Sequence, residues 1–247
     1  MNATGKRAVV TGAASGIGEA VVHRLLSEGA EVLAVDVDAD RLSWVGAAGA
    51  DPLVADLGTE AGCALVAEAG AGADYLVNSA GIIRLRPILE VDRDDWRDIF
   101  RVNAESIFFL CQQLGPTLRG GGAIVNLSSV SAKLTSTLET AVYAASKTTI
   151  LSITRSFAYA LAPRNIRVNA ICPGIIDTPM QDKVLDDVAA LRGMSVRELS
   201  DMRTETVPLA RGAAPSEAAA AIWFLLSDES SYMTGESMNF SGGLAMW

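Results

Sequence analysis

The sequence has few of the residues that build metal centres and disulfide frameworks. It contains three cysteines, Cys63, Cys111 and Cys172, and a single histidine, His23. The cysteines are widely spaced and form no CxxC pattern, so we expect neither a disulfide framework nor a zinc site. A reducing, cytoplasmic environment fits this usage best. His23 stands alone on an early helix and is expected to be a surface residue.

The sequence also lacks an excess of positive charge and long apolar runs. Its formal net charge is -9, whereas a nucleic-acid binder must offer clustered Lys and Arg to phosphates. No apolar run reaches the roughly 18 residues of a membrane span. A strand-like segment begins near Arg7, which leaves no room before it for a secretory leader. We therefore expect a cytoplasmic protein with neither a nucleic-acid nor a membrane partner.

What the chain does have is a regular alternation of short apolar runs and longer helix-period segments. With 247 residues, half of them apolar, it can bury one large core, and we expect a single domain over residues 1–247. The alternation predicts the α/β class, with a parallel sheet covered by helices on both faces. The strands are expected at residues 7–11, 31–36, 52–55, 75–78, 123–127, 166–171 and 237–240. The longest helices are expected at residues 96–118 and 142–161, and their apolar faces suit a core or a subunit interface.

Residues 178–208 interrupt this alternation with a charged, methionine-containing insertion. Long insertions in compact domains are usually functional or disordered, so we interpret this segment as a lid over a substrate site. A decorative surface excursion is the alternative.

A glycine-rich loop follows the first strand and opens a helix. Residues 11–18 are Thr-Gly-Ala-Ala-Ser-Gly-Ile-Gly, and such glycines allow a pyrophosphate to approach the backbone at the helix N-terminus. Asp36 ends the second strand about 20 residues later, where a carboxylate binds the adenosine ribose hydroxyls and repels a 2′-phosphate. Neither Val37 nor Ser15 offers a positive charge, so NAD is favoured over NADP. The alternatives are a plain glycine turn and an aspartate that only caps the next turn.

Tyr143 and Lys147 form the second motif, within Tyr-Ala-Ala-Ser-Lys. Residues four apart on a helix project from one face, and a nearby ammonium group lowers the pKa of a phenol toward values useful for a general base. The pair alone is common on ordinary helices. Ser129, at the end of the fifth strand, could hold a substrate oxygen, and Asn103 could anchor a water that carries protons from Lys147.

Together these segments resemble the short-chain dehydrogenase/reductase family over essentially the whole chain. The resemblance implies a Rossmann fold with a seven-stranded parallel sheet in the order 3-2-1-4-5-6-7. It implies that Tyr143 is the acid/base, that Lys147 lowers its pKa and binds the nicotinamide ribose, that Ser129 orients the reacting oxygen and that Asn103 completes a proton relay. The cofactor-binding residues that it implies are Gly12, Ser15, Gly16, Ile17, Gly18, Asp36, Asp56, Leu57, Asn78, Ala80, Gly81, Tyr143, Lys147, Pro173, Gly174, Ile176 and Thr178.

Two departures from the family pattern concern the catalytic serine and the substrate. The interval from Ser129 to Tyr143 is one residue longer than in most relatives, so Ser128 and Ser131 remain rival candidates. This spacing resembles a subgroup of hydroxy-acid and sugar-acid dehydrogenases, whose members tend to place an arginine three residues before the tyrosine. Here that residue is Thr140. Three cations could replace the arginine, and a neutral polyol or cyclic alcohol is an equally good expectation. The candidate cations are Lys133, Lys183 and Arg203.

The sequence thus predicts an NAD-dependent enzyme that interconverts a secondary alcohol and a ketone. The small-molecule substrate can be a polyol, a sugar, a cyclic alcohol or a small hydroxy acid. An inactive NAD-binding regulator and an isomerase or dehydratase that retains NAD are the alternatives. The resemblance also implies a homodimer or homotetramer. The apolar C-terminal segment, residues 242–247, is expected to dock and could reach a neighbouring subunit's active site.

Overall fold

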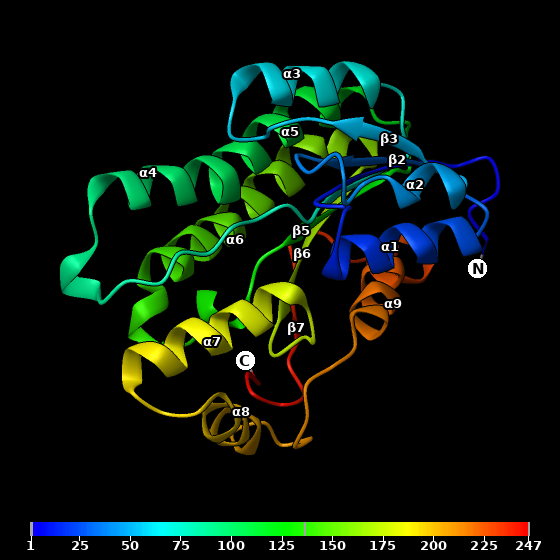
Figure 1. Ribbon diagram of the computed structural model, residues 1–247. Helices are drawn as coiled ribbons and strands as arrows, with labels where there is room; N and C mark the ends of the chain where they lie inside the picture. The colour runs from blue at the N-terminus through cyan, green and yellow to red at the C-terminus, as the bar shows by residue number, and fades with distance from the viewer. Residues whose placement is uncertain (1, 136, 247) are drawn as a thin grey trace.

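The computed structural model describes residues 2–135 and 137–246, and its centre is a parallel sheet. The strand order β3-β2-β1-β4-β5-β6-β7 confirms the predicted topology (Figure 1). The chain turns back at the centre of the sheet, where β1 pairs with both β2 and β4. A crevice opens at such a switch point beyond the carboxyl ends of the strands. The strands are β1 (Arg7–Thr11), β2 (Glu31–Asp36), β3 (Asp51–Val54), β4 (Tyr75–Asn78), β5 (Ala123–Leu127), β6 (Arg167–Pro173) and β7 (Ser237–Phe240).

Helices cover both faces of the sheet. Figure 1 shows α3, α5 and α6 on one face and α1 and α9 on the other. The helices are α1 (Gly16–Ser27), α2 (Trp44–Ala47), α3 (Glu60–Ala69), α4 (Arg93–Phe100), α5 (Ser106–Leu114), α6 (Ala141–Leu161), α7 (Pro179–Arg192), α8 (Val196–Glu205) and α9 (Pro215–Leu226).

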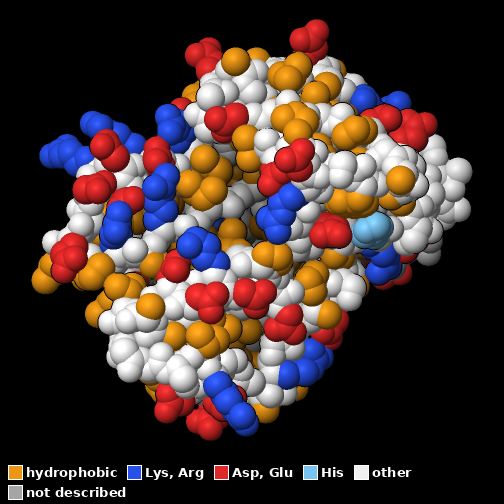
Figure 2. All heavy atoms as spheres, in the orientation of Figure 1, with side chains coloured by type: hydrophobic (Ala, Val, Ile, Leu, Met, Phe, Trp, Pro, Cys, Tyr) orange, Lys and Arg blue, Asp and Glu red, His pale blue; other side chains and the backbone are white. Residues whose placement is uncertain are grey.

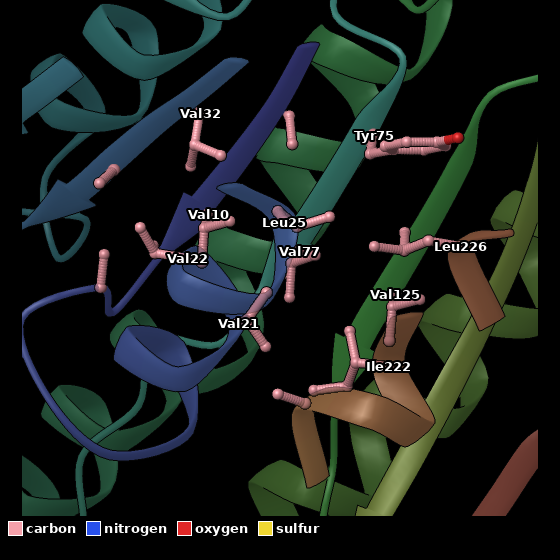
Figure 3. Packing of buried hydrophobic residues seen from close by; sticks show 14 of the residues in the cluster. Val10, Val21, Val22, Leu25, Val32, Tyr75, Val77, Val125, Ile222 and Leu226 are labelled. Atoms are coloured by element: carbon pink, nitrogen blue, oxygen red, sulfur yellow. The ribbon is translucent and has the colours of Figure 1, made fainter. Parts of the chain in front are cut away.

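Alternate residues of the central strands enter two separate cores. Val10, Val77 and Val125 face α1 and α9, as Figure 3 shows, and Val9 and Leu76 enter the core beneath α3, α5 and α6. This is the period of two that a pleated strand imposes. Because both faces of the central strands are buried, these strands are largely apolar, which explains why they appear as short apolar runs in the sequence.

Three of the predicted boundaries were wrong. β3 lies at Asp51–Val54 rather than 52–55, and β6 extends to Pro173, where it pairs with Phe240 of β7. The helix expected at 96–118 begins earlier and is not continuous. It consists of α4, one π-helical turn at Arg101–Glu105, and α5.

The π-helical turn coincides with a long-range contact of Asn103. Its side-chain Oδ1 accepts a hydrogen bond from Ile82 N at 2.8 Å, and its Nδ2 donates to Ile82 O at 2.9 Å. These bonds tie the turn to the segment after β4. π-Helical turns of this kind frequently occur at functional sites.

The insertion at residues 178–208 folds into the two helices α7 and α8. Thr178 caps α7, with its Oγ1 accepting from Gln181 N, and Ser195 and Glu198 form a reciprocal capping box on α8. The helices share a small apolar cluster that includes Val184, Val188 and Leu199. In Figure 1 they lie beside each other, close to the C-terminal segment.

Over the two described ranges, no helix is long and apolar enough to cross a membrane, and no cluster of His, Cys, Asp and Glu could hold a metal ion. The three cysteines are buried and unpaired. His23 is exposed and stacks on Trp44, with ring centroids 4.5 Å apart.

Candidate active site

A cavity of about 590 Å³ opens at the carboxyl ends of the strands. Its walls come from the loops after β1 to β6, from the first turn of α6, and from α7 and α8. Figure 2 shows the corresponding face hollowed near its middle, with acidic and basic side chains around the opening. Its volume falls in the range of cavities that take cofactors and small substrates.

The glycine loop forms one wall because glycine permits a very close approach of backbones. A Cβ atom on Gly12, whose φ is +67°, would lie 2.8 Å from the backbone nitrogen of Ala80. A Cβ atom on Gly18 would collide with the carbonyl group of Gly12. The loop therefore presses α1 against β1 and leaves the N-terminus of a 12-residue helix facing the cavity. This cradle fits the pyrophosphate of a nicotinamide dinucleotide.

Asp36 borders the cavity and holds two backbone groups. Its Oδ2 accepts from Ala14 N at 3.0 Å and its Oδ1 accepts from Asp38 N at 3.1 Å. The carboxylate therefore caps this turn while it borders the cavity, and both bonds are compatible with the predicted ribose-binding role. The next residue, Val37, lines the cavity with 63% of its surface exposed, and it brings no positive charge.

Tyr143 and Lys147 project into the cavity from the first turns of α6. The Lys147 Nζ lies 5.6 Å from the centroid of the Tyr143 ring and donates to Leu127 O at 2.8 Å. Lys147 is 4% exposed. The helix thus places the ammonium group beside the phenol, at the end of β5.

The pKa values of both groups are set mainly by burial. Burial raises the pKa of Tyr143 to about 12, and a hydrogen bond with Ser129 opposes that rise. Burial lowers the pKa of Lys147 to about 8. The expected lowering of the Tyr143 pKa by Lys147 is not found in this structure, where burial raises the pKa and the opposing contribution comes from Ser129. At neutral pH Tyr143 is a protonated phenol and Lys147 is still largely an ammonium ion.

The structure separates the three candidate serines. Ser129 lies close enough to Tyr143 to lower the pKa of its phenol, and its Oγ accepts from Ser131 N at 3.1 Å. Ser128 Oγ donates to Lys147 O at 2.8 Å, so its hydroxyl holds the backbone of α6. Ser131 borders the cavity. Of the three, Ser129 is the one whose side chain affects the pKa of the tyrosine.

Asn103 and Asn78 lie behind the cavity wall. Asn103 is fully buried and uses its amide on Ile82 and on Ser146 Oγ at 3.1 Å. Its Oδ1 and Lys147 Nζ each lie 3.4 Å from the Cβ position of Gly81, so both groups flank that glycine. Asn78 donates to Asn126 Oδ1 at 2.8 Å and does not line the cavity. Its expected contact with the cofactor is replaced by a role in joining β4 to β5.

The other sequence-predicted site residues all border the cavity. Apart from Asn103 and Asn78, every site residue that the sequence predicts lines the cavity. Members of this set are Gly12, Ser15, Gly16, Ile17, Gly18, Asp36, Asp56, Leu57, Ala80, Gly81, Ser129, Tyr143, Lys147, Pro173, Gly174, Ile176 and Thr178.

Sequence reasoning missed most of the lining that α7 and α8 contribute, including Val184, Val188 and Met202. The spacing of apolar residues within 178–208 is the sequence signal that could have revealed these lining residues. Leu244 also lines this chain's own cavity, and a reach of the tail to a neighbouring subunit stays a prediction. Trp247 lies outside the described residues.

Only one of the three candidate carboxylate-binding cations borders the cavity. Lys133 Nζ donates to Ser237 O at 3.0 Å, and Lys183 pairs with Asp187 at 2.9 Å. Neither lines the cavity, so the structure does not favour them among the three candidates. Arg203 does line it.

Comparisons with known proteins agree with this geometry. The family profile described as Enoyl-(Acyl carrier protein) reductase matches residues 12–245. The chain is 39% identical to galactitol 2-dehydrogenase (L-tagatose-forming) of Cereibacter sphaeroides, over 98% of this chain and 96% of the relative. It is 37% identical to a 3-oxoacyl-(acyl-carrier-protein) reductase of Thermotoga maritima, over 100% of both chains. A blue fluorescent protein from a metagenomic library, solved in complex with NADPH, superposes with a TM-score of 0.90 at 30% identity over 100% of both chains.

Proposed function

The chain belongs to the short-chain dehydrogenase/reductase family, and from that premise we propose that it is an NAD-dependent dehydrogenase of a secondary alcohol, with Tyr143 as acid/base. The observation that carries the proposal is the joint placement of Tyr143, Ser129 and Lys147. Ser129 lies close enough to the phenol to lower its pKa, the lysine Nζ lies 5.6 Å from the ring centroid, and all three border one cavity with the glycine loop.

The preference for NAD rests on the adenosine end of the cavity. The Asp36 carboxylate is held there by Ala14 N and Asp38 N, in a position to accept from ribose hydroxyls and to repel a 2′-phosphate. The lysines and arginines that line the described cavity are Lys147, Arg192 and Arg203, and none lies on the loop after β2. A related structure binds NADPH, so the preference needs a direct measurement.

In the proposed reaction Ser129 and Tyr143 hold the hydroxyl oxygen of the alcohol between them. For this direction Tyr143 first loses its phenol proton toward Lys147 and solvent, and the resulting phenolate takes the hydroxyl proton as the carbon–oxygen double bond forms. The bound oxidised cofactor supplies an acceptor for the hydride and a positive charge that lowers the phenol pKa. In the reverse direction the protonated phenol is already the dominant form, because burial holds its pKa near 12. The site can therefore protonate a ketone oxygen without further adjustment.

Lys147 contributes an ammonium charge beside the phenol. Its pKa of about 8 keeps it mostly protonated at neutral pH, and the hydrogen bond from its Nζ to Leu127 O fixes the orientation of the lysine side chain. We assign Asn103 a positioning role rather than a catalytic one, because its amide holds Ile82 and Ser146. Gly81 lies between the Asn103 amide and the Lys147 ammonium group, so a proton relay that joins these two groups would pass this glycine.

We also propose that α7 and α8 act as a lid over the substrate. They line the outer part of the cavity, and their apolar cluster packs them as one unit. We also propose a cytoplasmic location, because the three free cysteines suit a reducing compartment.

A spectrophotometric screen tests the proposed function. Purified protein is supplied with NAD or NADP and with polyols, sugars, cyclic alcohols and hydroxy acids, and the reduced cofactor is followed. We expect reduction of NAD with at least one alcohol class and a lower rate with NADP. Tight NAD binding with no turnover would favour the regulator, and consumption of substrate at constant absorbance would favour the isomerase or dehydratase. Reduction of acetoacetyl thioesters with NADPH alone would favour a role like that of the Thermotoga relative.

A further inference from the structure

The charged side chains of the cavity are divided by sign between its two ends. Its acidic lining residues are Asp36 and Asp56, on the loops after β2 and β3 where adenosine is proposed to bind. The lid helices instead contribute two arginines, Arg192 from the end of α7 and Arg203 from α8. In a chain of net charge -9, the substrate end of the cavity therefore carries only cations in its described lining.

Arg192 already has a fixed partner. Its Nε and Nη2 donate to the two carboxylate oxygens of Glu139 at 3.0 and 2.8 Å. Accordingly, the pKa of Glu139 is lowered and that of Arg192 is raised. This pair joins the end of α7 to the turn before α6 and cancels the charge of Arg192.

Arg203 has no such partner. It is half-buried, and across residues 2–135 and 137–246 its side chain makes no hydrogen bond or ion pair. Burial and the nearby charge of Arg192 both lower its pKa, and no acidic group opposes them. An arginine keeps its charge under these conditions, and burying a charge without a partner is costly. The Arg203 guanidinium is therefore available to bind an anion at the substrate end of the cavity.

We propose that Arg203 binds a carboxylate of the substrate, so that the alcohol oxidised is a hydroxy acid; this deepens the proposed function and rests on it. Guanidinium groups bind carboxylates through two parallel hydrogen bonds. A carboxylate carries one negative charge, which matches the single uncompensated positive charge of Arg203. A phosphate monoester carries nearly two negative charges and would exceed it. Thr140, three residues before Tyr143, is buried with its hydroxyl bonded to Thr137 O, so it offers no charge for this purpose.

The test compares matched acids and neutral alcohols on two arginines of the same helix. The pairs are 3-hydroxybutanoate with 1,3-butanediol, and gluconate with sorbitol. Arg203→Met removes the proposed anchor, Arg203→Lys keeps a charge, and Arg197→Met is the control because the Arg197 side chain is 92% exposed. We expect Arg203→Met to lower kcat/KM for the acids by about 10- to 100-fold, mainly through KM, which is the usual loss for a charge-assisted hydrogen bond. The neutral alcohols and the Arg197→Met control should be unaffected, and Arg203→Lys should retain part of the rate with acids.

A binding measurement separates this inference from the proposed function. Calorimetry with butanoate, a carboxylate without a hydroxyl group, is run on wild type and Arg203→Met, each saturated with NADH. Binding by wild type and its loss in Arg203→Met support the anchor even if no alcohol is turned over, in which case only the proposed function fails. Turnover of neutral alcohols with rejection of acids would overturn the anchor and leave the proposed function standing. Equal losses for acids and neutral alcohols, or Arg203-dependent turnover of sorbitol 6-phosphate alone, would also overturn it.

Discussion

Lys147 is kept in the cavity at a cost to stability that depends on pH. Its pKa is about 8 in the folded protein and has the ordinary value of 10.5 when unfolded. Between these values the unfolded state binds more protons, so the stability of the folded state rises with pH. The chain therefore tolerates an unfavourable charge below pH 8 where the chemistry needs it.

We predict that Lys147→Met abolishes this gain. Unfolding by denaturant is measured for both proteins between pH 8 and 10.5. The wild type should gain about 3 kcal/mol relative to the variant across that interval, since each pKa unit corresponds to about 1.4 kcal/mol. Tyr143 is present in both proteins, and loss of the hydrogen bond to Leu127 O lowers the free energy of unfolding of the variant by the same amount at every pH. The difference between the two proteins in the slope of this free energy against pH therefore reports the titration of Lys147. Parallel stability curves would contradict an unusual lysine pKa.

Asp36 carries the proposed choice of cofactor. We predict that Asp36→Ala weakens NAD binding by about tenfold or more, because hydrogen bonds to a charged group are lost, and affects NADP much less. Titration calorimetry with both cofactors measures the two constants. Asp38→Ala is the control, since Asp38 only accepts from Arg41 N. An equal loss for NAD and NADP would show that Asp36 only supports the loop through Ala14 N.

At the scale of elements, the junction of β1 and α1 depends on Gly18. We predict that Gly18→Ala destabilises the protein by about 1–3 kcal/mol, the usual cost of overpacking, because the added Cβ meets the Gly12 carbonyl. Gly46→Ala in α2 is the matched control. Nothing lies within 4 Å of its Cβ position, and helix propensity favours alanine there by up to about 1 kcal/mol. Thermal unfolding of both variants checks the pair, and destabilisation by Gly46→Ala as large as that by Gly18→Ala would refute the close-approach argument.

The sheet was predictable from the sequence because each element carries a local signal. Buried strands are short apolar runs, and the glycine loop and Tyr143-to-Lys147 spacing are read within a few residues. The interrupted helix between α4 and α5 was not predictable, because the π-helical turn is tied through Asn103 to Ile82, 21 residues earlier. Likewise, nothing local indicates that Arg192 is neutralised by Glu139 whereas Arg203 is left alone. Long-range pairing decides such features.

At the scale of the whole molecule, α4, α5 and α6 expose aromatic side chains. Trp96 is 48% exposed, Phe108 and Phe109 are each 39% exposed, and Tyr159 is 86% exposed. Trp96 stacks on Phe100, and Phe108 packs edge-on against Phe157, so aromatic side chains of α5 and α6 lie against one another at this surface. Such a face suits a subunit interface.

We therefore predict a homodimer or homotetramer assembled on this face. Phe108→Glu places a charge in the apolar patch and should yield a smaller species in light scattering than the wild type. Leu65→Glu is the control, because Leu65 is 43% exposed on α3, away from the aromatic patch. A wild-type monomer, or an unchanged mass after Phe108→Glu, would contradict the assignment of this face.

The most direct test of the account is the rate of hydride transfer in Tyr143→Phe. Wild type and variant, each saturated with NAD, are mixed with the best alcohol from the screen, and the single-turnover formation of NADH is followed. The variant should bind NAD as the wild type does, because the phenol oxygen serves proton transfer. Its hydride-transfer rate should fall by about 100-fold or more. A variant that keeps a substantial rate with normal NAD affinity would show that Tyr143 is not the acid/base.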